Sequence, residues 1–286
     1  MHEPPHGRPK EGSLPLGGTA RSAKGAQMTS AGAALLATRA LTLKVGPRTL
    51  FEGLSVEFGA GQVWCVIGAN GCGKTSLLHA LAGLRRPEAG GVELQGRPLS
   101  AWTAGEAACL RGLLPQSLSD AFSATALELV LMGRHPHLER WAWEGESDFV
   151  VARAALAAVD MLALEGRDAT TLSGGERQRV GIASLLAQDP LLLLLDEPLA
   201  HLDLRHQILV LGHLRELALQ GGKCVVLSIH DLNLARRFAT HALVLGGAGP
   251  RLGPVESVMD DATLSAAFGH AVSRVQVGSQ WLFVAA

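Results

Sequence analysis

Residues 62–75 read Gln-Val-Trp-Cys-Val-Ile-Gly-Ala-Asn-Gly-Cys-Gly-Lys-Thr, and this stretch decides the fold. Its first six residues are mostly apolar, as a strand buried in a parallel sheet requires. The next eight fit the phosphate-loop pattern G-x-x-x-x-G-K-[ST] without deviation, and a helical pattern continues to about Gly83. The stretch therefore predicts a strand, a glycine loop and a helix that bind a nucleoside triphosphate.

Each part of this loop has an expected task. The glycines let the backbone curl so that successive N–H groups face the β-phosphate, Lys74 reaches the β and γ oxygens, and Thr75 supplies a hydroxyl to magnesium. The predicted nucleotide-binding residues of the loop are Gly68, Ala69, Asn70, Gly71, Cys72, Gly73, Lys74, Thr75 and Ser76.

A second candidate element is the apolar run Leu191–Leu195 with the two acids that follow it. The run predicts a central strand that carries Asp196 and Glu197 out of the core at its end. Asp196 would order the magnesium shell, and Glu197 would polarise an attacking water. The structural alternative is two acids that merely begin a loop before Pro198.

Between these elements, residues 172–180 read Leu-Ser-Gly-Gly-Glu-Arg-Gln-Arg-Val. Ser173 can cap a helix whose first residues, Gly174 and Gly175, have no side chains to block an approaching anion. Exposed N–H groups and the helix dipole favour a negative charge there. An ordinary capping sequence from Ser173 to Glu176 accounts for the same pattern.

Because it lies between the phosphate loop and the two acids, segment 172–180 resembles the signature motif of ABC-type ATPases. The other motifs of that family occur in the expected order over roughly residues 41–275. The resemblance implies ATP and Mg²⁺ as cofactors, with Thr75, Gln116 and Asp196 at the metal. It implies catalytic roles for Lys74, Glu197 and His230, although a lone histidine after a strand can also be a structural residue. It also implies a homodimer or paired cassette in which one group of residues acts in trans: Leu172, Ser173, Gly174, Gly175, Glu176 and Asp203.

Segments 129–137, 204–207 and 231–235 look like those of importers for iron-siderophores, haem and cobalamin. The resemblance then implies an ATP-hydrolysing subunit, peripheral on the inner, cytoplasmic face of the cell membrane, with an integral-membrane permease and a substrate-binding protein as partners. His135 and His137 would face the permease, and a metal pair is the alternative. The rival function is a soluble ABC-type ATPase that acts as a binding switch in translation or DNA maintenance.

Three positions depart from the family pattern. Val45 stands where an aromatic ring usually lies beneath adenine, and the chain has no tyrosine. Leu199 replaces a common threonine, and Ser184 replaces a common arginine. None of the three has a catalytic role in the family, so these departures leave open the selectivity for adenine over guanine and the way in which the base is held.

Composition and pattern give the domain organisation. The 25 Lys and Arg residues against 26 Asp and Glu provide no basic excess for nucleic acid, and no apolar run reaches the ~20 residues of a membrane span. The four scattered cysteines are expected to be reduced.

The expected fold is an α/β P-loop cassette with a parallel-sheet core, an antiparallel β subdomain and a helical insert. Its predicted segments are a disordered leader at 1–37, the ATPase domain at 38–275 with the insert at about 117–171, and a tail strand at 276–286.

Overall fold

The computed structural model describes residues 34–117, 123–139, 142–247, 249–278 and 280–285. Most of the predicted leader therefore lies outside the described residues. Strand β1 (Ala34–Val45) begins four residues before the predicted start of the ATPase domain. Leu36 is fully buried in this early part and pairs with Leu94, so burial against a neighbouring strand extends the domain toward the N-terminus.

A six-stranded sheet forms the centre of the described chain, with the order β10-β9-β3-β8-β7-β6. Neighbouring strands are parallel except for β10, which runs antiparallel to β9. Every residue of β3, β7 and β8 is buried, because the sheet is covered on both faces. The six strands are β3 (Val63–Ile67), β6 (Arg111–Leu114), β7 (Leu192–Leu195), β8 (Cys224–Ser228), β9 (His241–Val244) and β10 (Arg251–Pro254).

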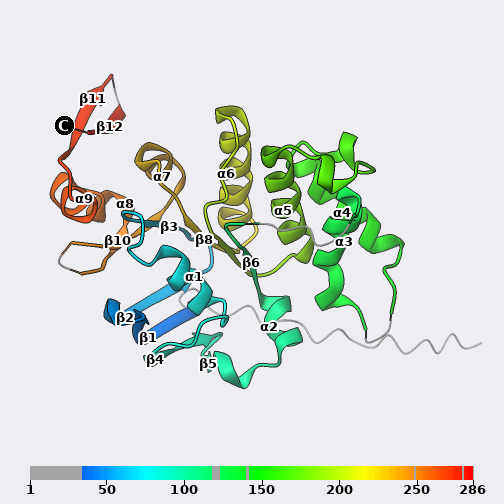
Figure 1. The fold of residues 1–286 in the computed structure, drawn as a ribbon, viewed down its shortest axis with the longest axis horizontal. Coiled ribbons are helices and arrows are strands. Elements are labelled where there is room, and N and C mark those ends of the chain that lie inside the picture. The colour runs from blue at the N-terminus through cyan, green and yellow to red at the C-terminus, as the bar shows by residue number, and fades with distance from the viewer. Residues whose placement is uncertain (1–33, 118–122, 140–141, 248, 279, 286) are drawn as a thin grey trace, which may run out of the picture. The chain divides into compact units, whose positions relative to one another are not determined.

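An antiparallel sheet with the order β2-β1-β4-β5 forms a second layer, and helix α1 (Lys74–Leu81) joins it to the central sheet (Figure 1). Leu77 and Leu78 are fully buried in a core that also contains Phe58 of the antiparallel sheet and Val66 of the central one. The remaining elements of this layer are β2 (Arg48–Gly59), β4 (Ala89–Leu94), β5 (Arg97–Pro98), η1 (Leu99–Ala101) and α2 (Ala104–Leu110).

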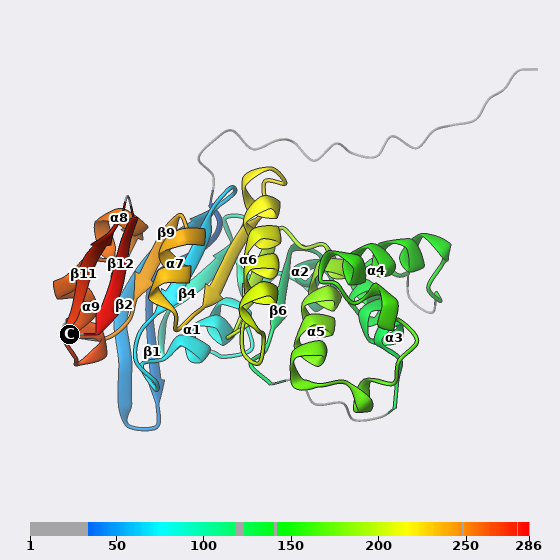
Figure 2. The same ribbon diagram turned by 90° about the horizontal axis from the view of Figure 1, so that it is seen from above.

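The predicted insert region is helical. It contains α3 (Ala126–Leu131), η2 (Met132–His137), α4 (Glu146–Ala158), η3 (Leu162–Leu164) and η4 (Ala169–Thr171). Of these, α3, η2 and α4 pack against α5 (Gly174–Gln188). Figures 1 and 2 show α3, α4 and α5 grouped beyond the β6 edge of the central sheet. Close packing requires Gly133, because a Cβ atom there would lie 2.2 Å from the Ser184 carbonyl oxygen.

The C-terminal part closes the other edge of the central sheet. The predicted tail strand corresponds to part of a hairpin, and the Asn233 side chain holds that hairpin through hydrogen bonds with both the N–H and the C=O of Phe283. Among the described residues, no helix is both long and apolar enough to span a membrane. Helix α6 (Leu204–Leu219) packs against β8 and β3 near the middle of the sheet. The elements that follow β8 are α7 (Leu232–Phe238), α8 (Val255–Val258), α9 (Asp261–Phe268), β11 (Val272–Val277) and β12 (Gln280–Ala285).

Candidate nucleotide-binding site

The glycine loop follows β3 and leads directly into α1. Gly68 has a φ of +152°, and a Cβ atom there would lie 2.4 Å from the backbone oxygen of Leu245, so a larger residue would displace the neighbouring strand end. Gly73 precedes α1 with a φ of +110°, and no side chain caps the helix. The first N–H groups of α1 are therefore available to an anion.

Lys74 lies folded over this loop. Its side chain is buried, and its ammonium group donates hydrogen bonds to the carbonyl oxygens of Gly68 at 2.9 Å and Ala69 at 3.3 Å. These neutral acceptors hold the ammonium group at the mouth of the loop. A triphosphate would offer it stronger, charge-assisted hydrogen bonds.

The acids at the end of β7 share one hydroxyl on the neighbouring strand. Ser228 Oγ accepts a hydrogen bond from the N–H of Glu197 at 2.7 Å and donates one to Asp196 Oδ1 at 2.7 Å. Asp196 is fully buried, and its Oδ2 atom has no hydrogen-bond partner within the described structure. Ser228 is not predicted from the sequence, because only the pairing of β7 with β8 brings it to the acids.

Glu197 and His230 form a second polar pair at the same sheet edge. His230 Nε2 lies 2.9 Å from Glu197 Oε1, and the side chains are 47% and 22% exposed. The backbone of Glu197 has a φ of +48°, which is uncommon for a residue with a side chain. The turn aims its carboxylate toward solvent while its neighbour Asp196 stays buried.

One cleft of about 500 Å³ brings most of the predicted site residues together. Gln116, Glu197 and His230 line it opposite the glycine loop, as the sequence predicts. Gly68, Ala69 and Cys72 do not line it, and Asp196 lies buried below its surface. The described lining is Val45, Arg48, Leu50, Asn70, Gly71, Gly73, Lys74, Thr75, Ser76, Gln116, Glu197 and His230, with no phenylalanine or tryptophan.

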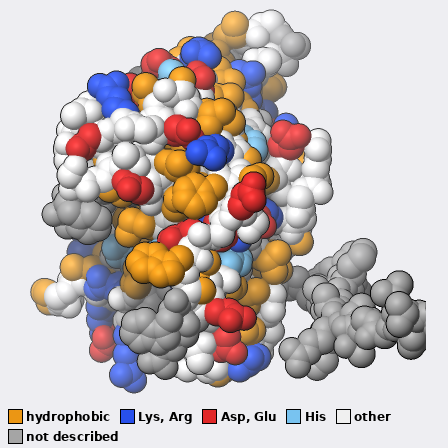
Figure 3. All heavy atoms as spheres, turned by 90° about the vertical axis from the view of Figure 1, so that its right-hand side faces the viewer, with side chains coloured by type: hydrophobic (Ala, Val, Ile, Leu, Met, Phe, Trp, Pro, Cys, Tyr) orange, Lys and Arg blue, Asp and Glu red, His pale blue; other side chains and the backbone are white. Residues whose placement is uncertain are grey.

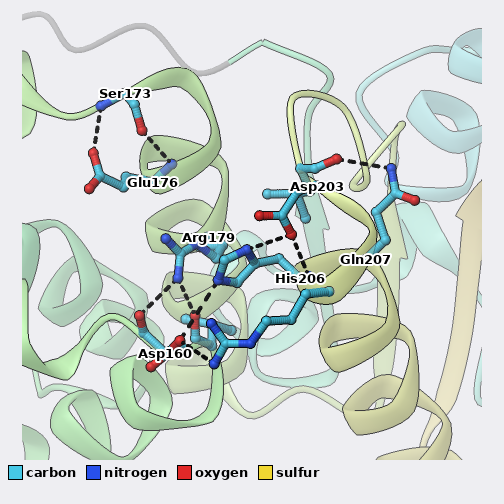
Figure 4. A network of polar contacts seen from close by, with 10 residues as sticks. Asp160, Ser173, Glu176, Arg179, Asp203, His206 and Gln207 are labelled. Carbon is cyan, nitrogen blue, oxygen red and sulfur yellow. Dashed lines mark hydrogen bonds and ion pairs between the residues drawn. The ribbon is translucent and has the colours of Figure 1, made fainter.

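Most of the predicted signature residues line a different hollow, the signature hollow. Ser173 caps α5, accepting a hydrogen bond from the N–H of Glu176, while the Glu176 carboxylate accepts one from the N–H of Ser173 at 2.8 Å (Figure 4). The capping interpretation is therefore confirmed for these residues. The hollow measures about 440 Å³ and is lined by Ser173, Gly174, Gly175, Glu176, Arg179, His201, Leu202, Asp203 and His206.

Two features shape this hollow. Gly175 is required by close packing, because a Cβ atom there would lie 2.7 Å from the backbone oxygen of His201. The N–H of His206 donates to the carboxylate of Asp203, and this contact holds the pKa of Asp203 below its usual range. Leu172 is buried beneath the start of α5.

The histidines of η2 make separate contacts. His135 lies 3.5 Å from Glu144, whereas a ring nitrogen of His137 lies 2.7 Å from the carbonyl oxygen of Gln188 at the end of α5. Within the described residues, no group of three or more His, Cys, Asp or Glu side chains is placed to hold a metal ion. The His137 contact instead ties η2 to α5.

A glycine loop between a parallel strand and an uncapped helix, at the same sheet edge as paired acids that follow β7, defines a P-loop nucleoside triphosphatase. A sequence model of the ABC transporter family matches residues 51–200. The chain belongs to the ABC transporter family and is an ABC-type ATPase.

Similar proteins extend this relationship over most of the chain. Hemin import ATP-binding protein HmuV of Streptomyces coelicolor is 42% identical over 244 residues, covering 84% of this chain and 85% of the relative. Achromobactin transport ATP-binding protein CbrD of Dickeya dadantii is 40% identical, with coverage of 82% and 87%. A solved metal-chelate type ABC transporter in an inward-facing conformation superposes with a TM-score of 0.77 at 31% identity, covering 88% of this chain and 98% of that one.

Proposed function

We propose that this chain hydrolyses ATP to energise an import permease for haem or a related metal chelate. Relatives at about 40% identity are named for the import of hemin, achromobactin and petrobactin, and the structural relative is of the metal-chelate type. Haem and iron-siderophores are the leading substrates, and cobalamin belongs to the same class of metal chelates. The expected position is peripheral, on the inner face of the cell membrane.

We propose further that two cassettes enclose two ATP molecules. The observation that carries this proposal is that the nucleotide cleft and the signature hollow share no lining residue. A triphosphate on the glycine loop of one chain would complete its coordination with Ser173 and Gly175 of a second chain. A dimeric bacterial ABC transporter cassette with a TM-score of 0.67 and 25% identity supports this arrangement.

Within the cleft, we assign three catalytic tasks. Lys74 would balance the charge of the β- and γ-phosphates, and the N–H groups of α1 would add to its effect. Glu197 would accept a proton from the attacking water, with His230 fixing the position of its carboxylate through the 2.9 Å contact. His230 would also meet the γ-phosphate, since it lines the same cleft.

The donor set fits magnesium. The unpartnered Oδ2 atom of buried Asp196 is an oxygen ligand without another use, and Thr75 and Gln116 contribute oxygen atoms at the cleft wall. Mg²⁺ prefers few protein oxygens together with phosphate and water, so a site with one carboxylate is adequate. When bound, the ion would neutralise charge on the transferred phosphoryl group.

The base of the nucleotide would lie against the hairpin between β1 and β2. Val45 and Arg48 pair at the end of this hairpin, and both line the cleft together with Leu50. Leu50 also packs against Gly73 of the glycine loop. Two apolar side chains and a planar guanidinium group would hold the base in place of the missing aromatic ring.

The helical insert offers the surface for a permease. Figure 3 shows the face on which the insert lies, where apolar side chains gather among charged ones. Met132, Trp143 and Val150 belong to the insert and are 45%, 89% and 63% exposed. Exposed apolar groups of this size suit a protein partner. A substrate-binding protein on the far side of the membrane would complete the system, with no nucleic acid involved.

The two-chain site is tested with Glu197→Gln, which removes the proposed base but keeps the side chain's size. We expect this variant to bind ATP and to form dimers only when ATP is present, as measured by sedimentation velocity. A variant that remains monomeric at saturating ATP would refute the arrangement.

The transported chelate is tested separately by uptake of labelled haem, ferric siderophore and cobalamin in deletion and complemented cells. Uptake that is unaffected for all three would refute the import function.

A further inference from the structure

Polar side chains from the helical insert and from α6 meet beside the signature hollow (Figure 4). Asp160 follows α4 on the insert, with a φ of +58°. Asp203 caps α6, and His206 lies between these two acids in the first turn of that helix. His206 also lines the hollow together with Ser173.

The imidazole of His206 holds Asp203 through one oxygen. His206 Nδ1 lies 2.8 Å from Asp203 Oδ1, and the backbone N–H of His206 donates to the same atom at 2.9 Å. A carboxylate only accepts hydrogen bonds, so the geometry assigns the ring hydrogen to Nδ1. Asp203 is 66% exposed, and its second oxygen remains available to another molecule.

The opposite side of the ring faces the insert. His206 Nε2 lies 3.7 Å from Asp160 Oδ2, and this contact is an ion pair when both ring nitrogens carry a hydrogen. Arg205 donates to the same oxygen at 3.1 Å. Arg179 of α5 donates to the backbone oxygens of Val159 and Asp160 at 3.2 and 2.8 Å, so the turn of the insert that carries Asp160 is fixed to α5. The His206 side chain is only 16% exposed between these groups.

We propose that His206 is a positioning residue, which orients Asp203 for contact with a second chain and anchors that orientation to the helical insert. The inference rests on the proposed two-chain site, in which Asp203 meets the partner cassette. His206 does not line the nucleotide cleft of its own chain, so it affects the pairing of chains and not the binding of ATP.

Two amide substitutions separate the functions of the two ring nitrogens. In His206→Asn the side-chain nitrogen occupies the place of Nδ1 and keeps the contact with Asp203. In His206→Gln it reaches the place of Nε2 and keeps only the contact with Asp160. The control is His213→Asn, a partly buried histidine of the same helix that lines a groove away from both clefts.

The readouts are ATP-driven dimerisation in the Glu197→Gln background and ATP affinity from titration of a fluorescent nucleotide. We expect His206→Gln to weaken dimerisation by about fivefold, with unchanged ATP affinity. His206→Asn and His213→Asn should remain within about twofold of the parent. Asp160→Ala, which removes the contact between the insert and His206, should weaken dimerisation less than His206→Gln does.

Amide hydrogen exchange at residues 204–207 in the single chain without nucleotide gives an independent measurement. Exchange should be faster in His206→Gln and unchanged in His206→Asn. Equal dimerisation of the Gln variant and the parent, or equal losses in the Gln and Asn variants, would overturn the role of His206. A parent that does not dimerise with ATP would instead refute the two-chain site, whatever the exchange pattern.

Discussion

Two helices of this protein have glycines at their starts, and they begin differently. Helix α1 follows Gly73 and has no side-chain cap, whereas α5 is capped by Ser173 and Glu176. The free N–H groups of α1 need a ligand, and they lie in a cleft with Lys74 and Glu197. The start of α5 is stable by itself and contributes a hydroxyl that can still donate a hydrogen bond. One helix start is thus suited to bind a phosphate, and in the proposed two-chain site the other would recognise a phosphate bound to a second chain.

The largest effect should follow loss of the proposed general base, the carboxylate of Glu197. Glu197→Gln should slow hydrolysis by about 10²- to 10⁴-fold and leave ATP affinity nearly unchanged, because the proton acceptor is lost while the phosphate contacts remain. Phosphate release and nucleotide titration measure the two quantities. Glu52→Gln, at an exposed position of β2, is the matched control. Wild-type turnover in Glu197→Gln would remove Glu197 from the role of base.

A pair of variants separates binding in the cleft from recognition in the hollow. Lys74→Ala should weaken ATP binding by about 10- to 100-fold, because a charge-assisted contact is lost. Gly175→Ala should leave binding intact yet lower turnover by about 10- to 100-fold, since its Cβ atom would lie 2.7 Å from the His201 oxygen and displace that loop. Weakened ATP binding in Gly175→Ala would contradict the separation of the two clefts.

Capping and phosphate recognition by Ser173 can be distinguished. Ser173→Ala should lower stability by about 1 kcal/mol through loss of the cap, measured by urea unfolding. Ser173→Asp retains a capping oxygen but repels phosphate, so it should keep its stability and lose ATP hydrolysis. Normal hydrolysis in Ser173→Asp would reduce Ser173 to a structural cap.

Arg48 tests how the base is held. Arg48→Ala should weaken ATP binding by about two- to fivefold without changing the affinity for inorganic tripolyphosphate, which has no base to stack. Arg48→Trp should restore ATP affinity. Arg251→Ala, at an exposed site on β10 outside the cleft, is the control. Equal losses for ATP and tripolyphosphate would indicate a phosphate contact instead.

The smallest effect is a pH dependence at the start of α5. The N–H of Ser173 donates to Glu176 and holds the pKa of that carboxyl below its usual range. A lowered pKa in the folded chain stabilises the fold above the pKa of the unfolded chain, and that contribution is lost as pH falls through the folded value. The stability difference between wild type and Glu176→Gln should therefore shrink on acidification in urea unfolding. A constant difference would contradict this assignment.

Local patterns predicted helices well where the ends carried clear signals. The sequence pattern predicts a helix near residues 261–268, and α9 has these limits, because Asp260 caps its start and Gly269 follows its end with a φ of +65°. The sequence predicts strands at 40–45 and 54–58, and both are longer in the structure. Strand β2 is extended toward the hairpin turn, whereas β1 is extended at its start, where it pairs with β2 and β4. Ser228 carries no signal in the sequence, although it binds Asp196 and Glu197 in the structure.

The sequence by itself determined the P-loop class, the acids after a buried strand and the capped glycine-rich helix, because each is a pattern within a few residues that dictates local backbone geometry. The tertiary structure decided which of these patterns meet. Parallel pairing of β7 with β8 brings Ser228 to the acids, and the hairpin between β1 and β2 brings Arg48 to the cleft. The signature helix lines a hollow of its own, because contacts between distant residues depend on strand order and packing.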